Sequence, residues 1–164
     1  MRTRNLGTVL MVFLTGCSAH LDPLDGPISI FDIKPQVFTY TELNSTQDIL
    51  WEKARRHIMS TYGKSQPILR VENKSRGALL GKGVIRWKIS ASTSNTYCNS
   101  EYDIRFMSRD NKARLQLLLL PNVSGDSECD NLGLPSKYGY EQILNKFEFM
   151  SNNLELALTT QSKI

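Results

Sequence analysis

The segment 77–83, with the sequence GALLGKG, contains the glycine and lysine residues that nucleotide-binding loops use to hold phosphates. A Walker-type loop needs four residues between its first glycine and the Gly-Lys pair, followed by a serine or threonine for magnesium. Here three residues intervene, and Gly83 occupies the hydroxyl position. The segment also leads into a predicted strand, whereas phosphates bind at a helix N-terminus. We therefore interpret it as a turn followed by a glycine-containing bulge.

Other side chains that could act as acids, bases or ligands lack the partners that such chemistry requires. His57 falls on a predicted helix without a Gly-x-Ser-x-Gly motif, and His20 lies three residues from Cys17. The two histidines have no metal-ligand spacing. Glu101 and Asp103 fall on the solvated side of a predicted strand, beside Arg105 and Arg114, and cross-strand ion pairing accounts for them. We expect no catalytic residues, no metal, no cofactor and no enzymatic activity.

The first seventeen residues indicate where the protein is located. Arg2 and Arg4 precede an apolar run of nine residues, 6–14, whereas a membrane-spanning helix needs about 20. The next residues, Leu-Thr-Gly-Cys ending at Cys17, resemble the lipobox of bacterial lipoproteins. The resemblance implies cleavage after Gly16 and acylation of Cys17, which anchors the chain in a bilayer. An ordinary secretory signal with a chance cysteine is the alternative. Aspartate immediately after the lipidated cysteine favours retention in the inner membrane. This chain has Ser18 at that position, which favours the outer membrane, with the domain facing the periplasm.

The mature chain is predicted to form one domain. Removing the signal peptide 1–16 leaves 148 of the 164 residues, which suits a single core. The 20 basic and 16 acidic residues become 18 and 16 once Arg2 and Arg4 are lost, a net charge of +2. Neither this charge nor the compartment favours nucleic acid. We assign 17–35 to the lipidated cysteine and a tether, and 36–164 to the domain. The tether contains three Pro or Gly residues before position 28, a composition typical of linkers.

Two cysteines, Cys98 and Cys129, remain after lipidation of Cys17. In an oxidising periplasm such a pair is more often bridged than free. Cys98 begins a predicted strand, and Cys129 lies in the loop that follows the hairpin partner of that strand. A hairpin folded about 109–111 therefore brings the two close together. We predict a disulfide, and metal binding is the weaker alternative.

Hydrophobic periodicity predicts an α+β domain with the order β-α-β-β-β-β-α. A helix begins after Ser45, which forms a capping-box-like pattern with Asp48, and ends at Gly63. A long helix from about Lys137 carries an apolar stripe that needs a partner. Period-2 alternation indicates an antiparallel sheet with one covered face. The predicted strands are 36–42, 66–73, 79–90, 97–107 and 112–120. We expect both helices to cover one face of a curved sheet.

Part of this pattern resembles a bacterial domain family of unknown function that has a TBP-like fold and often occurs on secreted lipoproteins. The residues that carry the resemblance are the strand 38–40, the helix 48–62 with Trp51 and Ala54, and the segment 77–83. The resemblance runs from Tyr40 to Trp87, about a third of the mature protein. The resemblance implies the fold and no established activity.

The solvated sheet face carries the predicted partner-binding residues, which are Arg86, Lys88, Arg105, Lys112 and Arg114. TBP binds DNA with its open face, but fold alone transfers no function. We expect a non-enzymatic, membrane-anchored binding or scaffolding domain for an envelope protein. The alternative is a small-ligand or inhibitor-binding module with a pocket under the 121–136 loop, and a charge-mixed face without any ligand also remains open.

Overall fold

The structure, a computed structural model, describes residues 24, 26–61, 68–91, 96–123, 129 and 132–160. The signal peptide, Cys17 and His20 therefore lie outside the described residues, as does Gly63. The order of the elements matches the predicted β-α-β-β-β-β-α, preceded by a short 3-10 helix, η1. The elements are η1 (Ile30–Asp32), β1 (Gln36–Tyr40), α1 (Gln47–Thr61), β2 (Leu69–Asn73), β3 (Ala78–Lys88), β4 (Tyr97–Arg109), β5 (Lys112–Val123) and α2 (Lys137–Thr159).

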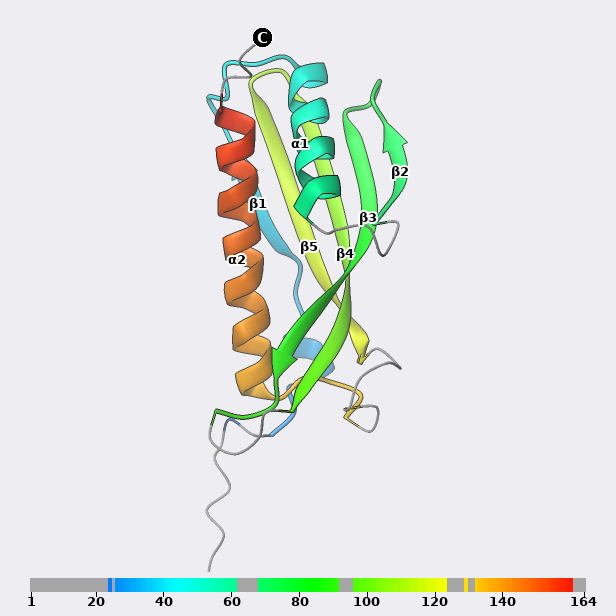
Figure 1. Cartoon of the computed structure of the whole chain (residues 1–164), viewed down its shortest axis with the longest axis vertical. Helices are drawn as coiled ribbons and strands as arrows, with labels where there is room; N and C mark the ends of the chain where they lie inside the picture. Colours follow the sequence, from blue (N-terminus) through cyan, green and yellow to red (C-terminus); the bar gives the residue numbers. More distant parts are fainter. Residues whose placement is uncertain are drawn as a thin grey trace, which may run out of the picture.

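The five strands form one antiparallel sheet in the order β1-β5-β4-β3-β2. Both helices cover the same face of the curved sheet, as predicted, and the other face carries no helix of the described chain (Figure 1). β4 and β5 form a long hairpin closed by the pair Arg109 and Lys112. We call this end of the molecule the hairpin end. The opposite end, where Cys98 begins β4, is the disulfide end.

The predicted alternation in the strands is confirmed by burial. Trp87, Tyr102 and Phe106 are each at most 1% exposed and point toward the helices. α2 contributes the predicted apolar stripe, of which Ile143, Phe147, Leu154 and Leu158 are buried. Burying each large apolar side chain contributes about 1.5–3 kcal/mol, so this layer accounts for much of the driving force for folding. Within the described residues, neither helix is long and apolar enough to cross a membrane.

The start of α1 differs from the predicted capping box of Ser45 and Asp48. The backbone N–H of Gln47 donates to the carboxylate of Asp110 at 2.8 Å, and the N–H of Asn111 donates to the Ser45 carbonyl at 2.8 Å. The free N–H groups of a helix N-terminus favour a negative charge. The β4–β5 turn supplies that charge from 63 residues away, so the local motif is not needed.

A close contact fixes α2 against β3 near the disulfide end. A Cβ atom on Gly139 would lie 2.3 Å from Cε3 of Trp87, so the helix backbone rests directly on the indole ring. The indole Nε1 donates to Ser100 Oγ at 2.9 Å. Ser136 Oγ accepts from the N–H of Gly139 at 3.0 Å and caps the helix. Glycine at position 139 thus allows the tight packing that buries Trp87.

The exposed backbone edge of β3 is covered by side chains of α2. β2 pairs only with the first residues of β3, up to Gly81. Farther along, the Gln142 amide donates to the Lys88 carbonyl at 2.8 Å and accepts from its N–H at 3.1 Å. Lys146 donates to the Arg86 carbonyl. These bonds satisfy edge groups that a neighbouring strand would otherwise use.

The described part of the predicted tether packs on the domain. Ile28 is 6% exposed, and its N–H donates to the Pro135 carbonyl at 2.9 Å. The N–H of Lys137 donates to the Gly26 carbonyl at 2.9 Å. The folded domain therefore begins at residue 26 or earlier. The tether, predicted to run from 17 to 35, accordingly ends before residue 26.

Replacing Gly139 by Ala is expected to lower the free energy of unfolding by about 1–3 kcal/mol, because the new methyl group overlaps the immobile Trp87 ring. This loss outweighs the gain of about 1 kcal/mol from the higher helix propensity of alanine. Chemical denaturation of the purified domain measures the change. The control Asn152→Ala, at an exposed position of the same helix, should change stability by less than about 0.5 kcal/mol. Equal stability of Gly139→Ala and the wild type would contradict the packing argument.

Candidate partner-binding surface

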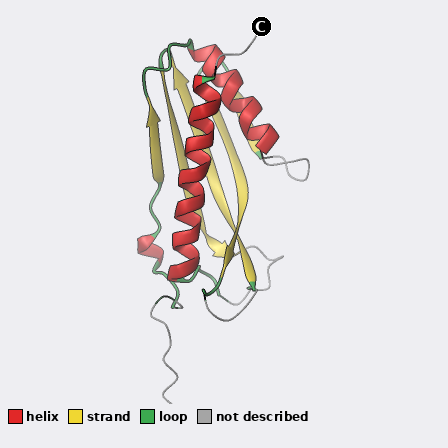
Figure 2. Cartoon of the chain, turned by 60° about the vertical axis from the view of Figure 1, so that its left-hand side comes forward, coloured by secondary structure: helices red, strands yellow, loops and turns green. Residues whose placement is uncertain are grey.

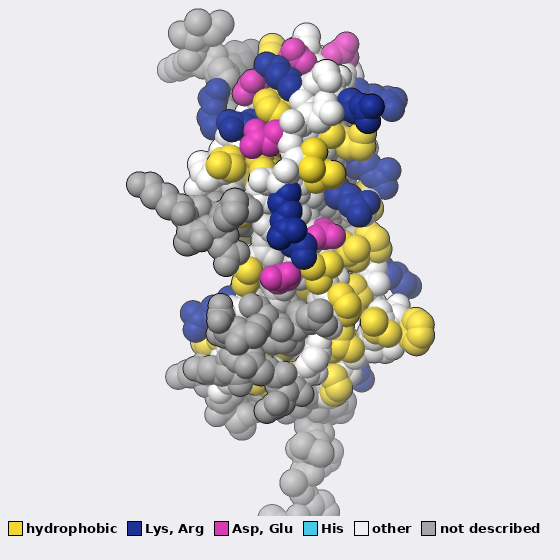
Figure 3. Space-filling model, turned by 90° about the vertical axis from the view of Figure 1, so that its right-hand side faces the viewer, with side chains coloured by type: hydrophobic (Ala, Val, Ile, Leu, Met, Phe, Trp, Pro, Cys, Tyr) yellow, Lys and Arg dark blue, Asp and Glu magenta, His cyan; other side chains and the backbone are white. Residues whose placement is uncertain are grey.

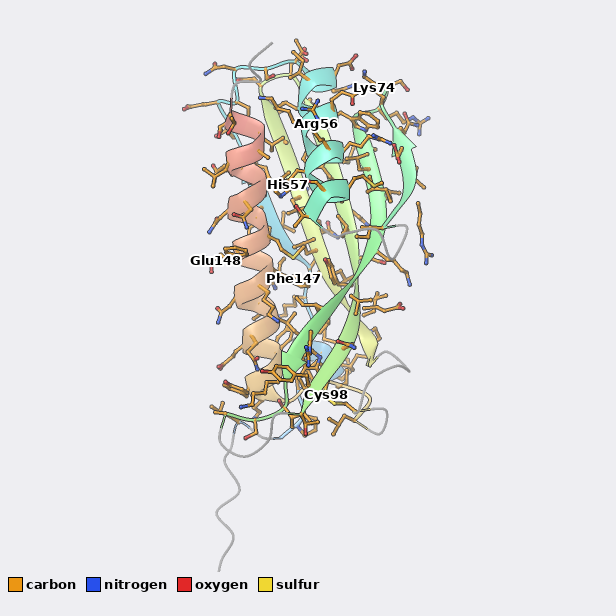
Figure 4. The ribbon with its side chains drawn as sticks, in the orientation of Figure 1. Arg56, His57, Lys74, Cys98, Phe147 and Glu148 are labelled. Carbon is orange, nitrogen blue, oxygen red and sulfur yellow. A yellow bond between two sulfur atoms is a disulfide. The ribbon has the colours of Figure 1, made fainter. Side chains whose placement is uncertain are left out.

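The predicted disulfide joins Cys98 to Cys129, with their Cα atoms 5.4 Å apart. Both cysteines are buried, and Cys98 lies opposite Trp87 in the β3–β4 pair. Figure 4 shows Cys98 at the disulfide end, beside the start of α2. The bridge closes a loop of 31 residues and holds position 129 against the sheet. While bridged, neither sulfur is available as a nucleophile or a metal ligand.

The five predicted basic residues do not form one platform. Arg105 lies opposite Leu80, whereas Arg86 lies opposite Asn99 and is six positions farther along β3. At about 3.3 Å per residue this separates the two arginines by about 20 Å. Lys112 and Arg114 follow the hairpin turn and belong with Arg105. Arg86 and Lys88 form a separate group at the disulfide end. The guanidinium carbon of Arg86 is 4.1 Å from the centroid of the Tyr97 ring.

An ion pair lies between the two basic groups. Lys82 Nζ is 3.3 Å from the Glu101 carboxylate, with both side chains substantially exposed. Asp103 lies opposite Lys82 in the strand register. The predicted cross-strand ion pairing is therefore confirmed for Glu101, although its partner is Lys82 on β3 rather than Arg105 or Arg114. Exposed pairs contribute little stability, so this pair mainly reduces the positive charge at the middle of the face.

Exposed apolar side chains surround Arg105 on the open face. Val71 is 45%, Leu80 38% and Met107 49% exposed. The register places Val71 opposite Leu80, and Met107 opposite Arg114. We call these three side chains together with Arg105 and Arg114 the open-face patch. Figure 3, which views the molecule from the side of β2, shows hydrophobic, basic and acidic side chains intermixed there.

A hollow of about 450 Å³ lies within the open-face patch. It forms where a β-bulge shifts the register between β2 and β3. Arg70, Val71, Leu80, Gly81, Lys82, Asp103, Ile104 and Arg105 line it. The sequence predicts a glycine-containing bulge in 77–83, and the register shift lies on the partner strand, between Leu69 and Val71. The hollow was not predicted, since it depends on the pairing of the two strands.

A larger groove of about 840 Å³ lies at the hairpin end, between the β1–α1 loop, α1 and the end of α2. Figure 4 shows Arg56 and Lys74 at this end, opposite Cys98. Three acidic residues balance three basic ones in its lining, which is Glu42, Leu43, Asn44, Ser45, Asp48, Ile49, Glu52, Lys53, Arg56, Lys74 and Thr159. We call it the distal groove. The predicted pocket under the 121–136 loop involves residues that lie partly outside the described ones, and it stays a prediction.

His57 packs between the two helices and the sheet (Figure 4). It lines a small cavity with Ile58, Leu115, Met150 and other apolar residues. Burial lowers its pKa from the ordinary value of 6.5, because charging the imidazole there would cost solvation. Among the described residues, no group of three His, Cys, Asp or Glu side chains is placed to hold a metal ion. His57 is thus positioned as a packing residue at the border of the core.

Comparison with known proteins identifies the fold. The five-stranded curved sheet with two helices on one face is the TBP-like α+β fold. A TBP-like protein from Parabacteroides distasonis superposes with a TM-score of 0.52 at 10% identity, over 80% of this chain and 97% of that protein. A DUF4468 family protein from Bacteroides ovatus superposes with a TM-score of 0.56 at 7% identity, over 84% and 93% of the two chains. No family model matches the sequence, and no curated protein matches it significantly.

Reduction of the disulfide is expected to lower the melting temperature, because it releases a constraint worth about 3–4 kcal/mol in the chain-entropy picture. The variant Cys98→Ser should melt at the temperature of the reduced wild type and should not respond further to reductant. Thermal unfolding with and without dithiothreitol measures both effects. Two reactive thiols at positions 98 and 129 in the unreduced, natively folded protein would contradict the bridge.

Acidification is expected to destabilise the wild type more than His57→Gln. Because the folded state lowers the pKa of His57 below 6.5, the unfolded chain binds the proton more readily. The contribution of His57 is present above 6.5 and is lost as the pH falls toward the folded-state pKa. Denaturant midpoints of both proteins between about pH 8 and pH 5 test this. Parallel curves for the two proteins would rule out a buried, neutral His57.

Proposed function

We propose that this protein is a lipid-anchored envelope protein whose domain binds a protein partner through the open-face patch. The observation that carries the proposal is the group of exposed apolar side chains around Arg105 on a sheet face without a covering layer in the described chain. Soluble proteins usually expose such side chains singly. Here they are neighbours across three strands, and Val71 and Leu80 line a hollow together with Arg105.

The chemistry of the patch suits a protein more than a small anion. Met107 and Leu80 offer apolar area, and Arg105 offers a planar donor group within the same patch. Methionine and arginine are enriched at protein interfaces, and lysine and glutamate are depleted. The Lys82–Glu101 pair lies at the border of the patch, as polar groups do at the rim of an interface.

A non-enzymatic role is supported by what the reactive side chains do in the fold. His57 packs against apolar residues, and Cys98 and Cys129 are bridged. The segment 77–83 enters β3, where a Cβ on Gly81 would meet the Ile68 carbonyl. Each residue thus has a structural use that accounts for its type.

Anchoring is the second part of the proposal and rests on the sequence. Cys17 ends the lipobox-like Leu-Thr-Gly-Cys. Two or more acyl chains give stable attachment to a bilayer, so acylation of Cys17 would anchor the domain. The proposed location is the outer membrane, with the domain facing the periplasm. The anchored domain would then contact a partner in the envelope at a limited distance from the bilayer.

The distal groove supports a second candidate, a small-ligand-binding module. Its volume of about 840 Å³ lies within the range of ligand sites, which is about 300–1,000 Å³. Its border contains Glu42 and Asn44, both with positive φ, a conformation that is costly without glycine. The balanced charges of its lining favour neither an anion nor a cation.

Crosslinking and affinity capture of the full-length protein from its own cells is expected to recover one reproducible envelope protein. Arg105→Glu should weaken capture at least tenfold, as a central interface arginine does, while leaving the melting temperature unchanged. The matched control Arg56→Glu reverses an exposed arginine of the distal groove and should leave capture intact. Loss with Arg56→Glu alone would overturn the open-face assignment in favour of the groove, and loss with Arg86→Glu alone would move it to the disulfide end. Cys17→Ala should leave the protein unlipidated and release it from the membrane fraction.

A further inference from the structure

The chain enters the folded domain at the disulfide end. Backbone hydrogen bonds join residue 26 to Lys137 and Ile28 to Pro135, and Leu24 accepts from the N–H of Tyr138 at 3.1 Å. The N-terminal segment is thus tied to the first turn of α2. Figure 1 shows this turn at the end of the molecule opposite the β4–β5 turn.

Chain length limits the distance between this end and a lipid anchor. Leu24 lies seven positions after Cys17, so the Cα atoms of the two residues can be at most about 25 Å apart. If Cys17 carries lipid, as the proposed function holds, the disulfide end must face the bilayer closely. The open-face patch, nearer the hairpin end, then lies farther from the membrane than Arg86 and Lys88 do.

Apolar side chains are exposed where the domain would meet this bilayer. Phe31 is 86% and Ile30 53% exposed, and Leu24 and Leu132 are 39% and 42% exposed. Phe31 has the highest exposure among the large hydrophobic side chains of the described chain. All four lie on segments next to the start of α2 or in the loop that leads into it.

Phe31 is held out on an ordered turn. Ser29 and Asp32 form a reciprocal capping box around η1, and the Tyr140 hydroxyl donates to the Asp32 carbonyl at 3.1 Å. Figure 2 shows this short helix beside the first turns of α2. Because the backbone is fixed at both ends, the two apolar side chains cannot turn inward without breaking these bonds.

We propose that Ile30 and Phe31 insert into the headgroup–acyl boundary of the bilayer that holds the Cys17 lipid. Two side chains bury far less area than the roughly 800 Å² per partner of a stable protein interface, so a protein is a poor candidate occupant. A weak contact becomes effective when a tether already holds it within reach, since the second binding step is intramolecular. Aromatic and aliphatic side chains are what such interfacial contacts use.

The insertion is driven by apolar burial more than by charge. The exposed charged side chains near η1 are Asp32, Lys34, Lys137 and Glu141, two acidic and two basic. Attraction to anionic headgroups therefore largely cancels. The contact should therefore form on zwitterionic vesicles, and Arg86 and Lys88, which lie at the same end of the molecule, can only strengthen it when anionic lipid is present.

The test uses the full-length, lipidated protein in phosphatidylcholine vesicles that contain brominated acyl chains. Phe31→Trp should lose emission to the bromines. The control Phe149→Trp replaces another exposed phenylalanine, at 67% against 86% for Phe31. Phe149 lies about 14 Å farther along α2 than Tyr140, so its tryptophan should keep its emission. Wild-type protein measures the background from the buried Trp51 and Trp87. Equal quenching of the two variants would overturn the insertion.

Flotation of the same samples separates this inference from the anchor itself. Protein that floats with the vesicles while the Trp at position 31 stays unquenched would leave the anchor intact and refute the insertion. Protein that remains at the bottom of the gradient would refute the anchor, and the insertion with it. Photocrosslinking from position 31 in cells to one protein, with no quenching in vesicles, would replace the bilayer by a protein as the occupant.

Discussion

Burial of Trp87 is the interaction on which most of the described structure depends. The indole ring lies between β3 and the first turn of α2, and Gly139 allows the helix to reach it. Its cross-strand neighbour is Cys98, so the disulfide loop is attached beside the same ring. The start of α2 in turn holds residues 26–28. Loss of this one contact would loosen the helix, the loop and the N-terminal segment together.

Much of the fold follows from local sequence patterns, and the exceptions share a cause. The predicted alternation in strands β3 to β5 agrees with the burial of Trp87, Tyr102 and Phe106, because a sheet with one covered face sorts side chains by parity. The Asp110 cap of α1 and the packing of residues 26–28 escaped prediction. Both are contacts of single backbone groups with distant segments, and such bonds leave no periodic signature.

The candidate surface was predictable in composition but not in arrangement. Parity correctly placed Arg86 and Arg105 on the same face of the sheet, but parity carries no information about position along a strand. The register between β3 and β4 sets them about 20 Å apart. The similarity to solved structures adds the fold alone, since identities of 7–10% transfer no surface chemistry. Any function must therefore be argued from the side chains of this chain.

The covering of the β3 edge by Gln142 and Lys146 has a consequence for crowding. Proteins held in a bilayer diffuse in two dimensions, share one orientation and collide repeatedly with the same sides facing each other. An uncovered strand edge would under these conditions favour edge-to-edge polymerisation. Because the side chains of α2 occupy the Arg86 carbonyl and both backbone groups of Lys88, this stretch of the β3 edge is not free to pair with a neighbouring copy. If the proposed lipid anchor holds this chain at high surface density, joining of two sheets through this stretch would be disfavoured.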